Sequence, residues 1–146
     1  MGFWKEEEMA KQTPLLMKSF AADTAIANAN VCVVMSGSNA GNVALPGGAL
    51  ATKFVGVTAE PVASGSSTNE LAVQIAGIAQ IQTDGSATIA AGDYVAIANS
   101  SGQIKTVAPA SGTNVRELVG IALSGATNTA GLLVDVLIQP MVYIGA

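Results

Sequence analysis

The fold of this chain is decided by residues 71–82, which read LAVQIAGIAQIQ. Apolar residues and one glycine occupy the odd positions: Leu71, Val73, Ile75, Gly77, Ala79 and Ile81. The even positions include three glutamines: Gln74, Gln80 and Gln82. This alternation predicts a β-strand with one face in a core and the other against water or a partner. Because Ala72, Ala76 and Ile78 make the second face only half polar, we expect that face to be partly covered.

Short apolar runs separated by turn residues lie on both sides of this strand. We expect further strands at Val31–Met35, Asn42–Leu45, Phe54–Ala59, Asp93–Ala98, Gln103–Val107, Glu117–Leu123 and Leu132–Gln139. The sequence therefore predicts an all-β domain over residues 30–146.

Three short segments of this domain recur at a spacing of about 61 to 64 residues, which indicates an internal repeat. The pairs are Val55-Gly56-Val57 with Val119-Gly120-Ile121, Leu71-Ala72-Val73-Gln74-Ile75 with Leu132-Leu133-Val134-Asp135-Val136, and Gly41-Asn42-Val43 with Gly102-Gln103-Ile104. We predict two similar four-strand halves, about 31–82 and 93–142, which together close a small β-sandwich or barrel. A chance coincidence of β-rich sequence is the alternative.

Residues 1–29 differ from the rest and are expected to form an N-terminal arm, either extended or with short helices. They contain seven of the sixteen charged residues, three of the six aromatic residues and one of the sixteen glycines. A helix over 2–11 and a second helix from Pro14 to Phe20 are possible, but both are too short to be stable alone. Aromatic and aliphatic residues in such a segment favour docking on a neighbouring subunit or a scaffold. The residues expected to make that contact are Phe3, Trp4, Leu15, Leu16 and Phe20. A self-packed or disordered leader is the alternative.

The C-terminal residues 141–146 read MVYIGA and contain no charged side chain. Chain ends are usually polar and frayed. We therefore expect this end to lie in the core or in a subunit interface, with Met141 and Tyr143 among the contacts.

Composition excludes several classes of protein. Charged residues make up 11% of the chain and its net charge is −4, so no basic stripe suits nucleic acid. Although 50% of the residues are hydrophobic, polar residues interrupt every apolar run before it reaches membrane-spanning length. Glu6, Glu7 and Glu8 stand where a secretory signal would be basic, so we expect synthesis in a cytoplasm. The single cysteine, Cys32, lies in an apolar run and is expected to be a buried structural thiol.

The residues of common catalytic and metal sites are missing from the sequence. It contains no histidine and one cysteine, so a serine–histidine triad or a zinc site cannot be built. The pairs Asp84-Gly85 and Gly92-Asp93 lie in turn contexts, where aspartate is favoured for its local hydrogen bonds. We therefore predict no enzymatic activity and no cofactor.

Four segments of the β domain resemble small phage proteins of the head region. They are Ala91-Gly92-Asp93-Tyr94-Val95-Ala96-Ile97, Ser101-Gly102-Gln103-Ile104, Leu118-Val119-Gly120-Ile121-Ala122 and Leu133-Val134-Asp135-Val136. The resemblance covers about residues 30–140 and points to the capsid decoration, or cement, proteins. It implies a homotrimer on the outer surface of the virion capsid that binds the major capsid protein and stabilises the shell. The arm would contact neighbouring decoration subunits.

The alternative function is a carbohydrate- or host-surface-binding module displayed on a capsid or fibre. Such a module needs exposed aromatic residues on the β domain, where only Phe54, Tyr94 and Tyr143 are available.

Overall fold

The computed structural model describes residues 13–63, 66–107 and 115–144 and contains only β-strands and connecting segments among them. The predicted all-β class is confirmed. The strands are β1 (Thr13–Ala22), β2 (Cys32–Met35), β3 (Val43–Ala44), β4 (Phe54–Thr58), β5 (Ser66–Gln82), β6 (Tyr94–Ile97), β7 (Ile104–Thr106), β8 (Val115–Ala122) and β9 (Leu133–Ile144). All eight strands expected from the sequence are present as β2 to β9.

Strand β1 corrects one expectation, because residues 14–20 do not form a helix. They belong to a strand that pairs antiparallel with β5, from Thr13 opposite Ile78 to Ala22 opposite Ser66. A seven-residue helix would satisfy few backbone groups, whereas the edge of β5 offers hydrogen bonds along the whole segment. Residues 13–29 thus pack with the sheet. Residues 1–12 lie outside the described part of the chain, including the expected helix over 2–11.

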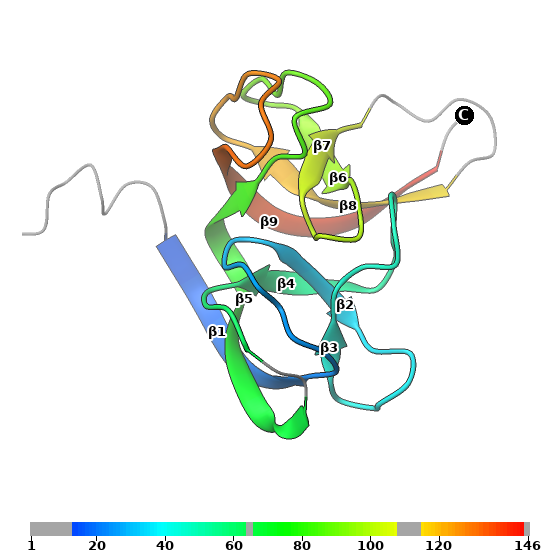
Figure 1. The fold of residues 1–146 in the computed structure, drawn as a ribbon. Helices are drawn as coiled ribbons and strands as arrows, with labels where there is room; N and C mark the ends of the chain where they lie inside the picture. Colours follow the sequence, from blue (N-terminus) through cyan, green and yellow to red (C-terminus); the bar gives the residue numbers. More distant parts are fainter. Residues whose placement is uncertain (1–12, 64–65, 108–114, 145–146) are drawn as a thin grey trace, which may run out of the picture.

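One sheet contains all nine strands, in the order β1-β3-β2-β4-β5-β9-β8-β6-β7 (Figure 1). The additional pairing of β1 with β5 closes the first five strands into a ring. The closing contact on the other side of β1 is a parallel pair, Ala22 with Val43 of β3.

The remaining strands repeat this pattern. Strands β6 to β9, here called the second run, pair with one another as strands β2 to β5 of the first run do. In the first run β2 pairs with β3 and β4, and β4 pairs with β5. In the second run β6 pairs with β7 and β8, and β8 pairs with β9. Strand β5 also pairs with β9, and Thr83, directly after β5, makes a parallel bridge to Ile104 of β7. The strands β5 to β9 therefore form a second ring, in which β5 takes the place that β1 has in the first.

Two hydrophobic cores lie on the two sides of β2. The first contains Val31 and Val33, together with Ala22, Ile26, Val43, Val62, Leu71 and Val73. The second contains Cys32 and Val34, and its other members come mainly from β5 to β9 and the segments between them. Successive residues of a strand point to opposite faces, so β2 separates the cores while contributing to both. The backbone N–H of Cys32 donates to the carbonyl oxygen of Gly102 at 2.7 Å, which attaches the second run to β2.

Strand β5 joins the two rings. Its odd positions are largely buried as predicted, with Leu71 and Val73 in the first core and Ala79 and Ile81 in the second. Gln74 is an exception to the expected polar face, because it is buried and its amide donates to backbone carbonyl groups within β5. Between the two cores, Gly77 has a φ of 98°.

Candidate interaction surfaces

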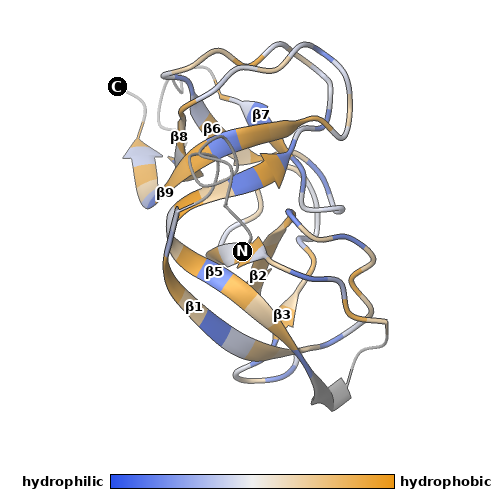
Figure 2. Cartoon of the chain, turned by 90° about the vertical axis from the view of Figure 1, so that its left-hand side faces the viewer, coloured by the Kyte–Doolittle hydropathy of each residue, from blue (hydrophilic) through white to orange (hydrophobic). Residues whose placement is uncertain are grey.

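The first candidate surface, here called the β1 edge, consists of Leu15–Ser19. Leu15, Leu16 and Met17 are exposed, and the exposed fraction of Leu15 reaches 76%. These residues alternate in direction along the strand, so both faces of this part of β1 are open to solvent. In Figure 2, where hydrophobic residues are orange, orange stretches mark the ribbon of β1 beside β5. Large apolar groups exposed together on a strand are a feature of interaction sites.

Phe20 belongs to the same strand but packs against the first core. The Nζ atom of Lys18 lies 5.5 Å from the centre of its ring, a cation–π contact. Phe20 therefore anchors β1 to the body of the protein, while Leu15 and Leu16 face outward.

The second candidate surface, here called the β9 tail, consists of Met141–Ile144 together with Val115 opposite them on β8. Val142 and Ile144 are 61% and 67% exposed, and Tyr143 is also exposed. Val115 pairs with Ile144, so the apolar side chains of the two strands lie side by side. Within the described residues this part of β9 pairs with β8 alone, which leaves its other backbone edge open.

The two surfaces lie on opposite sides of the molecule: the N-terminal half of β1 is at the left of Figure 1, and the ends of β8 and β9 are at the right. They therefore suit two different contacts.

The structure brings the sequence-predicted residues together in part. Leu15 and Leu16 lie on the β1 edge, Met141 and Tyr143 lie on the β9 tail, and Phe20 packs inward. Phe3 and Trp4 lie outside the described residues. The sequence reasoning did not select Met17, Val115, Val142 and Ile144, although the uncharged run at residues 141–146 signalled the last two.

A separate polar cluster forms around Asp23, at the end of β1. Its carboxylate accepts hydrogen bonds from the Ser36 hydroxyl and from the side-chain amides of Asn39 and Asn42. These hydrogen bonds, that of Ser36 first, lower the pKa of Asp23. The cluster holds the turn between β2 and β3 against the end of β1, which is a structural role.

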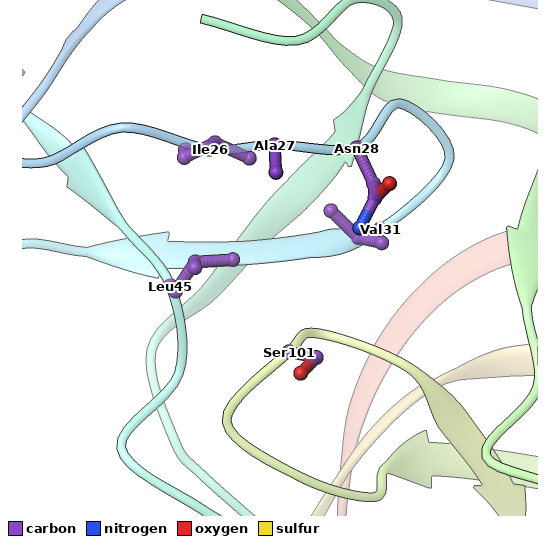
Figure 3. Close-up of a pocket in the computed structure, with 6 residues that line it drawn as sticks. All are labelled: Ile26, Ala27, Asn28, Val31, Leu45 and Ser101. Carbon is purple, nitrogen blue, oxygen red and sulfur yellow. The ribbon is translucent and has the colours of Figure 1, made fainter. Parts of the chain in front are cut away.

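A small pocket of about 130 Å³ lies between the two runs of strands (Figure 3). Its lining is formed by Ile26, Ala27, Asn28, Val31, Leu45 and Ser101. Only Asn28 and Ser101 contribute polar side chains, and no charged residue lines it.

Among the described residues no three histidine, cysteine, aspartate or glutamate side chains gather to hold a metal ion. The described part of the chain has no helix that could cross a membrane. No protein-family model matches the sequence. No curated protein matches it either.

Proposed function

We propose that this protein is a virion structural protein: a capsid decoration protein that binds the outer surface of a phage shell as a homotrimer and stabilises it. The sequence resemblance over residues 30–140 suggests the class. The observation that carries the proposal is the pair of exposed apolar strand segments, the β1 edge and the β9 tail, at the left and right ends of the molecule in Figure 1. A protein that cements a lattice needs several contact surfaces on a rigid body.

The energetics fit this role. Each apolar strand surface is small, so a single contact would be weak. Contacts of this kind between copies join them into a trimer, and a trimer that repeats its capsid-facing contacts in each subunit gains affinity through multivalency. The partners in this proposal are the major capsid protein and neighbouring decoration subunits, and the site of action is the capsid surface.

We also infer that the chain is a duplicated unit. Equivalent contacts support this: Ala22 with Val43 matches Thr83 with Ile104, and the isolated bridge of Ile26 with Val62 matches that of Ile89 with Ala126. These contacts extend each half to five strands with β5 common to both, instead of the four strands that the sequence suggested. Such a shared strand makes the two halves a single rigid support for the exposed surfaces.

Binding to undecorated, expanded capsids tests the function. Purified protein is mixed with capsids, which are then sedimented, and the bound protein is quantified together with the temperature at which the shells open. Co-sedimentation and a raised opening temperature are the expected results. A full-length protein that stays in the supernatant would refute the decoration function.

A truncation tests the arm, and the structure determines where to cut. Deleting residues 1–29 would remove β1 and expose the first core, so weak binding would only report misfolding. Deleting residues 1–12 keeps β1 and removes Phe3 and Trp4. We expect weaker capsid binding by this shorter chain, and equal binding would show that residues 1–12 make no contact with the shell.

The alternative, a carbohydrate-binding module, has two exposed aromatic residues to use in the described part of the chain, Tyr94 and Tyr143. Their partners on β8 are Ile121 and Arg116, five residues apart, which corresponds to about 17 Å along a strand. That separation does not form one stacking platform for a sugar. Binding to a glycan array that is lost in Tyr94→Ala would favour this alternative.

A further inference from the structure

The open backbone edge of β1 is the feature that leads beyond the proposed function. Strand β1 pairs with β5 along its length, but on its other side it meets β3 only at Ala22. Among the described residues, Leu15–Ser19 therefore present one row of backbone groups without a strand partner. Unpaired edges with apolar side chains are templates for the addition of another strand.

In the second run of strands, the edge that corresponds to the open edge of β1 belongs to β5 and is covered. The matching bridges, Ala22 with Val43 and Thr83 with Ile104, place β1 and the C-terminal half of β5 in equivalent positions, 61 residues apart. In β5 this edge is covered at residues 76–78, because β1 pairs with it antiparallel, with Thr13 opposite Ile78 and Leu16 opposite Ala76. The fold thus covers this position with an antiparallel strand in β5, whereas in β1 no described residue covers it.

The β9 tail offers a strand of suitable length and character. It has its own open edge, carries no charged side chain, and exposes Val142, Tyr143 and Ile144 much as β1 exposes Leu15, Leu16 and Met17. Each open segment follows a proline, Pro14 or Pro140, which has no backbone N–H to donate. A ladder between the two strands is therefore confined to Leu15–Ser19 and Met141–Ile144.

We propose that these two edges bind each other between copies of this chain: the β9 tail of one copy adds antiparallel to the β1 edge of the next. The two surfaces are unlike and lie on opposite sides of the molecule, so the contact is head to tail. A two-fold dimer through either surface would leave the other exposed, whereas a closed ring covers both in every copy. The number of copies in the ring, three, rests on the proposed function.

The test uses two full-length variants, each of which blocks one side of the contact. Leu16→Glu places a charge on the β1 edge and Val142→Lys places one on the β9 tail. Light scattering after size exclusion, at micromolar concentration, is expected to give a trimer for the native chain and a monomer for each variant. A mixture of the two variants is expected to form a heterodimer, because the Leu16→Glu chain keeps an intact β9 tail and the Val142→Lys chain keeps an intact β1 edge. Leu123→Glu is the matched control, since Leu123 is 46% exposed against 51% for Leu16 and lies in neither surface, and it should remain trimeric.

Several outcomes would overturn the inference. A monomeric native chain would do so, as would a mixture that stays monomeric or a Val142→Lys variant that assembles as the native chain does. Hydrogen exchange on the native protein gives a measurement that needs no variant: amides of residues 15–19 should become protected as concentration rises. Protection that is independent of concentration and disappears when residues 1–12 are deleted would assign the edge to that segment instead.

Capsid binding separates this inference from the proposed function. A chain that forms the head-to-tail ring but does not bind capsids refutes the decoration function alone. A chain that binds and stabilises capsids as a monomer refutes the ring and the homotrimer, and leaves the decoration of the capsid standing.

Discussion

Glu117 of β8 binds the start of β4 through Phe54. Its Oε1 atom accepts a hydrogen bond from the backbone N–H of Phe54 at 2.9 Å, and its Oε2 atom accepts one from the N–H of Lys53 at 3.0 Å. Lys53 has a φ of 66°, an uncommon value for a residue with a side chain, so this turn needs support. One carboxylate thus links the second run of strands to a strained turn of the first.

Replacing Glu117 with alanine should destabilise the protein, because two backbone donors lose a charged acceptor. Hydrogen bonds to charged groups contribute about 1.5–3 kcal/mol each when desolvated, and the pair here is partly exposed, so we expect a loss of about 1–3 kcal/mol. Urea denaturation measures it. Glu70→Ala, which removes an exposed carboxylate from β5, is the control and should change the free energy of unfolding little. Equal effects of the two substitutions would show that the link to Phe54 contributes nothing specific.

The Asp23 cluster predicts a dependence of stability on pH. The pKa of Asp23 is lowered in the folded protein from its ordinary value of 3.8, because Ser36, Asn39 and Asn42 hydrogen-bond to the charged form. A group with a lowered folded pKa stabilises the protein above its unfolded pKa, and that contribution is lost as pH falls through the folded pKa. We therefore expect the difference in unfolding free energy between the native chain and Asp23→Asn to be largest at neutral pH and to shrink below about pH 4.

The comparison for this prediction is Asp84→Asn, at the equivalent position of the second run. Asp84 accepts hydrogen bonds from Ser86 alone among the described residues. Denaturation curves at neutral and acidic pH should show the larger pH-dependent difference for Asp23→Asn. A difference for Asp23→Asn that does not change with pH would contradict the role of its charge.

Local pattern was sufficient to predict most of the strands. The alternation in residues 71–82 and the turn residues around the short apolar runs determine β2 to β9, since those signals depend on near neighbours in sequence. Strand β1 was missed because its run Leu15-Leu16-Met17 does not alternate between apolar and polar residues, although side chains on both faces of the strand are exposed there. Its strand conformation comes from the edge of β5, whose paired residues are 44 to 65 positions away in the sequence, and no local pattern contains that information.

The candidate surfaces were predicted in part for the same reason. An uncharged C-terminus is a local signal, and it predicted burial in the core or in a subunit interface. Val142, Tyr143 and Ile144 are exposed in the single chain, so they do not lie in its core, and the subunit interface stays a prediction. The sequence could not predict that Phe20 packs inward while Leu16 is exposed, because the two apolar residues differ in their distance from the first core, which is known only from the fold. The sequence also did not predict that β5 belongs to both rings, because the sequence repeat begins after β1 and suggests four strands for each half.

Cys32 should be unreactive in the folded protein. It is fully buried in the second core, and this burial raises the pKa of its thiol, so the reactive thiolate is suppressed. Ellman's reagent is expected to modify Cys32 only as the protein unfolds, so its rate of labelling in increasing urea should follow the unfolding transition seen by circular dichroism. Rapid labelling of the native protein in the absence of urea would contradict the packing of β2 between the two cores.

Gly77 should be the position at which a single added methyl group separates β1 from the sheet. An added Cβ would lie 2.2 Å from the carbonyl oxygen of Thr13, and the φ of 98° is strained for any residue with a side chain. We expect Gly77→Ala to cost more than about 1 kcal/mol, with Gly48→Ala, at an open site without a positive φ, as the control. The cost should be local: hydrogen exchange should increase first in the amides of β1 and the facing part of β5, while β8 and β9 keep their protection. If instead all strands lose protection together, then β1 is not a separable edge of the sheet but opens only with the whole fold.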